Sequence, residues 1–152
     1  MYSPSDASQP MNDLFVAHEP KLRFVITGIL HALGIPAHIM GYSYLREAVI
    51  LSIQNPMQFK RVTRTLYPHL AEQFQTTPAS VERAMRHAVR SAWKSEGAAM
   101  QRSVFQYFAL SKQKRPTNGE LISTLADGIQ YYMLTMLQAD GEMKVFSENP
   151  AL

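Results

Sequence analysis

The sequence predicts an all-α domain of about six helices with a helix-turn-helix at its centre. Three observations support this fold class. Ala, Leu, Met and Gln are frequent and glycine is sparse, with 7 residues in 152, which favours helices over strands. Apolar residues recur at helical spacing along most of the chain. Proline, glycine and an Asn-Pro pair separate these periodic segments, as they do between helices.

Length and composition indicate one domain. A chain of 152 residues that is 46% hydrophobic can bury a core of its own, which we assign to residues 20–138. Residues 1–19 are expected to form a flexible leader with a docked turn at Leu14-Phe15-Val16, and residues 139–152 an irregular tail. The absence of cysteine excludes disulfides, thiolate metal ligands and cysteine nucleophiles, and agrees with a reducing interior.

The helices follow from the apolar periodicity and its interruptions. Their expected positions in chain order are about Lys21–Leu33, about Gly41–Gln54, a segment from near Met57 that Pro68 kinks or restarts, Pro78 to about Lys94 with Gly97 closing it, about Ala99–Leu110, and Thr117 to about Leu137. Thr117 and Glu120 have the spacing of a capping box.

One stretch imitates a membrane span. From Phe24 to Leu45 no Asp, Glu, Lys or Arg occurs over 22 residues, which is long enough to cross a bilayer. Histidines, Gly34 and Pro36 interrupt this run. We therefore interpret it as two buried helices joined by a short link.

The stretch from Tyr67 to Lys94 organises the rest of the chain. Two periodic segments flank a polar break at Gln75-Thr76-Thr77, where such a turn often contains glycine. Thr77 can cap the second helix, and Pro78 suits its first position. At about 100° per residue this helix places apolar residues on one side and a basic stripe on the other. A surface helix with solvated charges explains the periodicity equally well.

The distribution of charge favours a functional interpretation of that stripe. Residues 60–94 contain seven basic and two acidic residues, a net charge of +5, whereas residues 1–59 and 95–152 each carry −1. The whole formal net charge of +3 thus comes from the segment around the predicted helix-turn-helix. Concentrated positive charge of this kind is typical of phosphate binding.

Many residues between about 22 and 135 match one known family. The matching positions include residues 34–39, 41–42 and 44–48, residues 66–68, Phe74, residues 76–77, Val81 to Ala84, Arg86 to Ala88, Ala92-Trp93, residues 116–118 and Glu120. In these residues the chain resembles the C-terminal DNA-binding effector domain of stage 0 sporulation protein A, the sporulation response regulator. The resemblance implies an all-helical, cytoplasmic, nucleoid-associated protein that binds duplex DNA at a box with a TGTCGAA-like core.

The resemblance also implies specific roles. Glu82 and Arg83 should address bases, which suits Arg as a reader of guanine and Glu as an acceptor from cytosine. By the resemblance, Arg86 and His87 should help to hold the DNA backbone. Independently of the resemblance, Arg90, Lys94, Lys112 and Lys114 are expected at the backbone because they flank the reading positions or lie on a basic loop. The predicted backbone contacts also include Arg64, Thr77 and Ser80. Ser80 departs from the family, which carries a basic residue there. Other partners considered are the RNA polymerase sigma subunit and a second copy on tandem sites, through a surface around Tyr131, Tyr132 and Met136.

No other chemistry is indicated. The five histidines show no His-Glu-x-x-His spacing, and no phosphate loop or serine nucleophile motif occurs, so we expect no metal, cofactor or catalytic residue. Only about 20 residues precede the first predicted helix, so we expect no receiver domain and DNA binding that needs no phosphorylation. The alternative is a protein-interaction module of the same fold that binds another regulator or RNA polymerase with weak or lost DNA binding.

Overall fold

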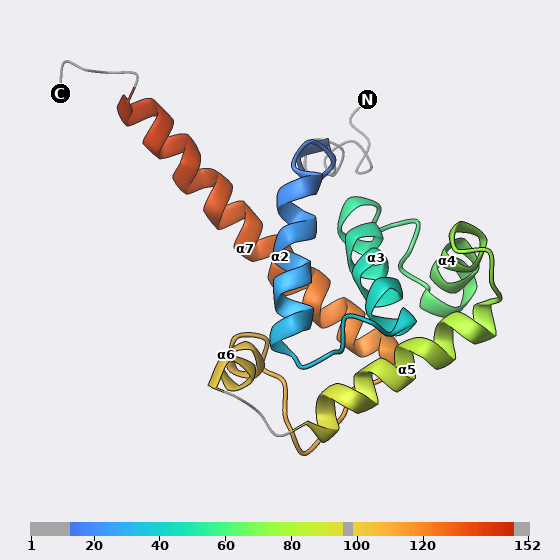
Figure 1. The fold of residues 1–152 in the computed structure, drawn as a ribbon. Coiled ribbons are helices and arrows are strands. Elements are labelled where there is room, and N and C mark those ends of the chain that lie inside the picture. Colours follow the sequence, from blue (N-terminus) through green and yellow to red (C-terminus); the bar gives the residue numbers. More distant parts are fainter. Residues whose placement is uncertain (1–12, 96–98, 148–152) are drawn as a thin grey trace.

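The computed structural model describes residues 13–95 and 99–147 (Figure 1). Its elements are α2 (Glu19–Ala32), α3 (Met40–Gln54), the π-helical segment η1 (Val62–Leu66), α4 (Tyr67–Gln73), α5 (Pro78–Lys94), α6 (Ala99–Tyr107) and α7 (Asn118–Ser147). A helical turn over residues 13–17 precedes α2. In the described ranges the only extended pairing is an isolated bridge between Ser111 and Lys114. The predicted all-α fold is confirmed.

Helix α3 lies at the centre of the bundle, where it packs against α2, α5 and α7. It is buried on most of its circumference, and its Leu45, Ala48 and Val49 are fully buried. Helices α3 and α5 cross in close contact because Gly41 carries no side chain. A Cβ at Gly41 would lie 2.2 Å from the carbonyl oxygen of Ala84. This crossing holds the inner side of α5 against the core.

Helices α4 and α5 form the predicted helix-turn-helix. Phe74 follows the last residue of α4, and its ring contacts that of Tyr44 edge-on with 5.0 Å between centroids. Gln75 adopts a left-handed φ of 54°, and the next amide, of Thr76, donates to the carbonyl of Ala71 over 2.8 Å. Gln75 therefore occupies the conformation that glycine usually supplies in this turn.

The segment before α4 differs from the prediction of a helix starting near Met57. Residues 56–61 form turns and bends, and η1 begins at Val62. Pro68 restarts the helix as the second residue of α4, where its missing N–H needs no partner. Because Pro68 cannot donate to Arg64, the preceding turn widens, and the amide of Tyr67 bonds the carbonyl of Val62 five residues back.

Helix α7 is longer than predicted. It continues to Ser147, so the predicted end near Leu137 and the irregular tail are wrong for residues 139–147, whereas residues 148–152 lie outside the described residues. The pair Asp140-Gly141, a combination typical of turns, lies within the helix and does not end it. A glycine costs a helix interior only about 1 kcal/mol and does not by itself end it. Figure 1 shows the C-terminal half of α7 extending away from the bundle.

Two other helix ends differ in detail. Helix α6 stops at Tyr107 because Ala109 takes a left-handed φ of 54°, and the amide of Leu110 then donates to Phe105 over 2.7 Å. Alanine favours helix, so no local signal in the sequence indicates that α6 ends here. Helix α5 spans the predicted residues, but the extended backbone of Ser95 follows it directly. Gly97, predicted to close it, lies outside the described residues.

The N-terminal part of the described chain confirms the docked turn. Phe15, in the helical turn over residues 13–17, is fully buried in the core. Helix α2 begins at Glu19 rather than Lys21, with Pro20 in its first turn. The uncharged run from Phe24 to Leu45 is divided between α2 and α3 as predicted, and none of the helices in the described part of the chain could span a bilayer.

Candidate nucleic-acid interface

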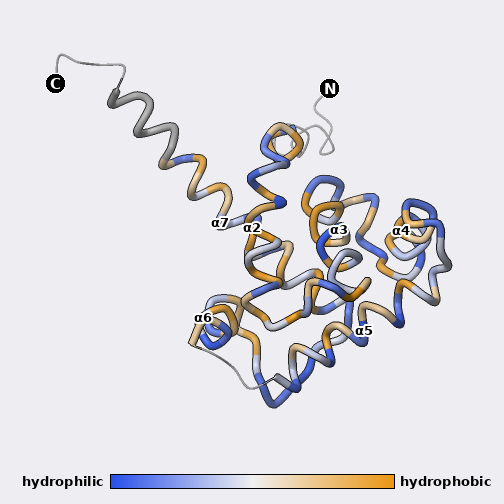
Figure 2. The backbone as a smooth tube through the Cα atoms, in the orientation of Figure 1, coloured by the Kyte–Doolittle hydropathy of each residue, from blue (hydrophilic) through white to orange (hydrophobic). Residues whose placement is uncertain are grey.

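Helix α5 has one buried face and one exposed basic face. Its inner residues Val81, Met85, Ala88, Val89 and Ala92 are at most 1% exposed. The outer residues Arg83, Arg86, His87, Arg90 and Lys94 are all exposed. Figure 2 shows the resulting alternation of hydrophobic and hydrophilic residues along the helix. The predicted amphipathic pattern is confirmed, and its outer stripe covers about 100° of the helix surface.

The first turn of α5 is capped locally. The Thr77 hydroxyl oxygen accepts a hydrogen bond from the Ser80 amide over 3.1 Å, and the hydroxyl donates to Ser80 Oγ over 2.9 Å. Pro78 takes the first helical position. The predicted N-cap is confirmed, and it presents the Thr77 side chain at the start of the basic face.

Glu82 and Arg83 lie on different parts of the helix surface. Arg83 is exposed at the centre of the outer stripe, whereas Glu82 is half-buried at its edge, about 100° away. One carboxylate oxygen of Glu82 lies 3.6 Å from the guanidinium of Arg86, one turn further along. The ion pair is loose and partly solvated, so it leaves both side chains able to turn toward a ligand.

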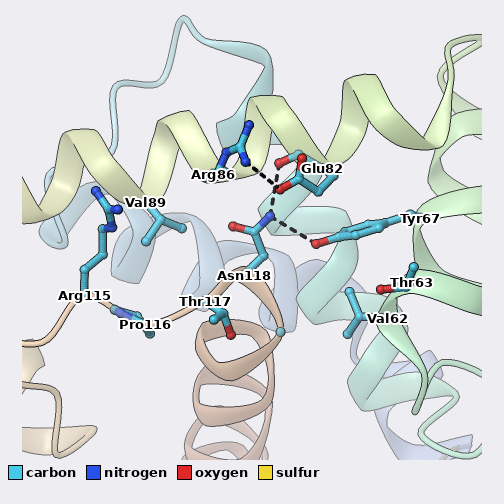
Figure 3. A pocket seen from close by; sticks show the side chains of 11 residues that line it. Val62, Thr63, Tyr67, Glu82, Arg86, Val89, Arg115, Pro116, Thr117 and Asn118 are labelled. Carbon is cyan, nitrogen blue, oxygen red and sulfur yellow. Dashed lines mark hydrogen bonds and ion pairs between the residues drawn. The ribbon is translucent and has the colours of Figure 1, made fainter.

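Asn118, the first residue of α7, anchors the early part of α5 (Figure 3). Its amide nitrogen donates to the backbone carbonyl of Glu82 over 3.1 Å and to the Tyr67 hydroxyl over 3.0 Å. One buried side chain thus joins α7 to both helices of the helix-turn-helix. Burial raises the pKa of the Tyr67 hydroxyl above its ordinary value, so the hydroxyl stays protonated at neutral pH.

A cleft of about 510 Å³ lies beside this anchor, between η1, α5 and the start of α7. Arg86 and Arg115 border it from two different elements, together with Glu82 and the hydroxyls of Thr63 and Thr117 (Figure 3). Thr117 caps the start of α7 at the edge of this cleft as predicted, since the Glu120 amide donates to Thr117 Oγ1 over 3.2 Å and the Thr117 hydroxyl donates to Glu120 Oε1 over 3.0 Å. The cleft widens the polar surface that adjoins the outer face of α5.

The last turn of α5 is held by side chains from outside the helix. The ammonium of Lys112 donates to the carbonyl of Ala92 over 3.1 Å and also to that of Ser95. The buried amide of Gln101 donates to the same Ala92 carbonyl over 3.1 Å. Lys112 was predicted at the DNA backbone, and the structure gives its charge two partners within the protein.

The remaining predicted backbone residues are accessible. Arg64 is exposed on η1, and Lys114 is exposed on the loop between α6 and α7. Ser80, Arg83, Arg86, His87 and Arg90 line one shallow hollow along α5. Lys60 and Arg61, which add to the local charge, are exposed as well. In the part of the chain that the structure describes, no three His, Asp or Glu side chains gather as metal ligands would.

Two residues have structural roles that the sequence did not predict. Asn118 and Gln101 each connect segments that are far apart in the chain, with hydrogen bonds spanning up to 51 and 68 residues. Neither residue type is exceptional at its position in a helix. Long-range hydrogen bonds follow from the packing of helices and leave no local pattern, so periodicity could not reveal them.

Comparison with known proteins decides the family. A family model described as "Sporulation initiation factor Spo0A C terminal" matches residues 26–129. The chain belongs to this family. The match runs from within α2 to within α7 and includes the whole helix-turn-helix. Spo0A C-terminal domains are DNA-binding effector domains, a family without enzymatic activity. The outer face of α5 is therefore the candidate DNA-binding surface of this Spo0A C-terminal domain.

Proposed function

We propose that this chain is a sequence-specific DNA-binding regulator of transcription that places α5 in the major groove. The exposed basic stripe of α5 carries this proposal, because the same helix is completely buried on its other side. A helix held in that way has a fixed position from which its outer side chains can reach the groove. Family membership supports DNA binding in general.

In this proposal Arg83 and Glu82 read bases. Arg83 is exposed in the second turn of α5, where the side chains of a recognition helix reach the groove floor. Its guanidinium can donate two hydrogen bonds to guanine O6 and N7, and the Glu82 carboxylate can accept from cytosine N4. Because the two side chains project about 100° apart, they address neighbouring base pairs rather than the same one.

The other residues on and around the stripe, which are exposed except for the half-buried Ser80, contact the DNA backbone. Phosphate contacts of this kind fix the register of the helix and supply most of the salt-dependent affinity. We assign them to Arg86, His87, Arg90 and Lys94 on α5, to Thr77 and Ser80 at its start, and to Arg64 and Lys114 on neighbouring segments.

The proposed target is a duplex box with a TGTCGAA-like core, and tandem boxes should bind two copies cooperatively. Tyr131 is 72% exposed and Tyr132 is 40% exposed on α7, which provides apolar surface for a contact between copies. Met136 nearby is only partly exposed. A contact worth about 1–2 kcal/mol would raise the affinity of the second copy by about 5–30-fold. The RNA polymerase sigma subunit is the proposed partner in transcription.

A titration of matched duplexes tests the proposal. The chain is titrated with one duplex that carries the box and one with the same bases scrambled, in the same salt. We expect much tighter binding to the box, and we expect acetyl phosphate to have no effect because the stripe is already exposed. Equal, weak binding to both duplexes would contradict the proposal and favour a protein-interaction module.

A further inference from the structure

The end of α5 closes with a polar cluster built from three other parts of the chain. The last carbonyls of a helix have no partner within it and need donors from elsewhere. The Ala92 carbonyl accepts from Lys112 Nζ, from Gln101 Nε2 and, over 2.9 Å, from Ser95 Oγ. The Ser95 carbonyl accepts from Lys112 as well. A single lysine therefore caps the last turn of the recognition helix, although it lies 20 residues after Ala92 and 17 residues after Ser95 in the chain.

The surroundings of Lys112 hold its side chain in place. Its ammonium lies 5.7 Å from the centre of the Phe105 ring, and Phe105 stacks on Trp93 with 4.9 Å between centroids. The Trp93 indole N–H donates to the Ser111 carbonyl over 2.9 Å, next to Lys112 in the chain. A cation–π contact and a stacked ring pair thus fix the lysine against the last turn of α5.

Gln101 extends the cluster to α2. Its side chain is 4% exposed, and its amide nitrogen also donates to the Leu33 carbonyl over 2.8 Å. Ser95 approaches so closely here that a Cβ at Gly34 would lie 2.8 Å from Ser95 Oγ, and Gly34 has a φ of +88°. The end of α5 is therefore tied to the end of α2, to α6 and to the loop that follows α6.

We infer that Lys112 is a positioning residue for DNA recognition, which sets the orientation of α5 and makes no phosphate contact. The inference rests on the proposed function. Asn118 fixes α5 at Glu82, and Lys112 fixes it at Ala92, about 15 Å further along the axis. Two anchors at that separation determine the tilt of a helix. The ammonium also interacts favourably with the negative end of the helix dipole.

This arrangement has a consequence that differs from that of a phosphate contact. Loosening the last turn tilts the helix, so base contacts on a specific site lose their geometry. Binding to random DNA depends on charge and tolerates tilt. Loss of the Lys112 anchor should therefore lower the affinity for the box more than the affinity for DNA of random sequence.

The experiment compares Lys112→Met with Lys114→Met, which removes the same charge from the same loop at an exposed position. Dissociation constants are measured on box and scrambled duplexes over a salt series, after thermal melts show that each variant is folded. For Lys112→Met we expect about tenfold weaker box binding, the effect of one lost charge-assisted hydrogen bond. Scrambled-duplex binding and the salt slope of Lys112→Met should match those of the parent. Lys114→Met, at a proposed phosphate contact, should instead weaken binding to both duplexes alike and flatten the salt slope by about one unit. Lys112→Arg should recover most of the box affinity.

Two results would overturn the inference. One is an equal loss of affinity by Lys112→Met on both duplexes, together with a slope of log affinity against log salt that is flatter by about one unit. That result indicates a phosphate contact. The other is binding by Lys112→Met that equals that of the parent on both duplexes. If Lys112→Met does not fold, Lys112→Gln, which keeps a shorter donor, takes its place in the same comparison.

Hydrogen exchange separates failure of this inference from failure of the proposed function. If the parent itself does not distinguish the two duplexes, the proposed function is wrong. The amides of residues 92–95 should still exchange about tenfold faster in Lys112→Met than in Lys114→Met, because the cap is lost. Equal exchange in the two variants would show that Lys112 does not hold the end of α5.

Discussion

The two faces of α5 differ in role: the inner face packs against the core, and the outer face is the proposed DNA-binding surface. The inner face, with Val81, Met85 and Ala88, is completely buried against the core, and Gly41 lets the backbone of α3 approach it directly. The outer face, with Arg83 and Arg90 among its residues, is exposed. Substitutions on the inner face should therefore act through the free energy of unfolding. Substitutions on the outer face should act through DNA affinity and leave stability unchanged.

The largest expected effect comes from the inner face. Met85 is fully buried, and Met85→Ala would remove apolar contacts and leave a cavity. We expect a loss of about 2–5 kcal/mol in the free energy of unfolding. Chemical denaturation of Met85→Ala beside the exposed-face variant Arg90→Ala measures this, and equal stability of the two would break the distinction between the faces.

Arg83→Ala should give the next largest effect, on binding alone. Loss of a bidentate contact with guanine should cost about 1–3 kcal/mol on the box and relax the preference at one base pair. Glu82→Ala should relax the neighbouring base pair with a smaller loss of affinity, because Glu82 also repels phosphates. Titrations against duplexes with single-base changes measure both. Unchanged base preference in Arg83→Ala would show that this residue does not read the sequence.

Backbone contacts should produce a smaller and more uniform effect. Arg90→Gln removes one exposed charge from the outer stripe and should weaken box and scrambled duplexes by the same factor. The slope of log affinity against log salt should become flatter by about one unit. A slope equal to that of the parent would remove Arg90 from the set of phosphate contacts.

The smallest expected effect concerns the Tyr67 hydroxyl, which accepts a hydrogen bond from the Asn118 side-chain amide. Because its pKa is raised in the folded state, the folded protein retains the hydroxyl proton to higher pH than the unfolded chain does. Retention of this proton stabilises the folded protein. The stabilisation is fully present below the pKa of the unfolded chain, about 10, and is lost as the pH rises through the folded pKa. Tyr67→Phe should abolish that decline, which denaturation between neutral and alkaline pH can measure against the parent.

Local signals predicted the parts of the molecule that depend on neighbouring residues. Thr77 and Pro78 gave the start of α5, the periodicity gave its two faces, and Thr117 with Glu120 gave the start of α7. The end of α6 was misplaced because Ala109 gives no local signal, and the end of α7 was misplaced because the Asp140-Gly141 pair does not break the helix. The π-helical turn before Pro68 also required the structure, because a proline shows that a carbonyl is left free without showing how the chain adjusts.

The candidate site follows the same division. The exposed stripe of α5 could be predicted from the sequence of that helix alone, because the helical repeat and the residue types determine which side is exposed and charged. The anchors at Asn118, Gln101 and Lys112 were not readable, because each depends on contact between distant segments. Lys112 and Lys114 illustrate the difference. They belong to one basic loop in the sequence, yet one ammonium faces carbonyls within the protein and the other side chain is exposed.

Selection of binding sites from random DNA tests the central claim, that the outer face of α5 reads a DNA sequence, most directly. The parent chain and Arg83→Ala are each used to select duplexes over several rounds, and the enriched sequences are compared. We predict that the parent enriches a TGTCGAA-like core and that Arg83→Ala enriches the same core with one position degenerate. The claim is contradicted if the parent enriches no common sequence, or if both proteins enrich an identical one.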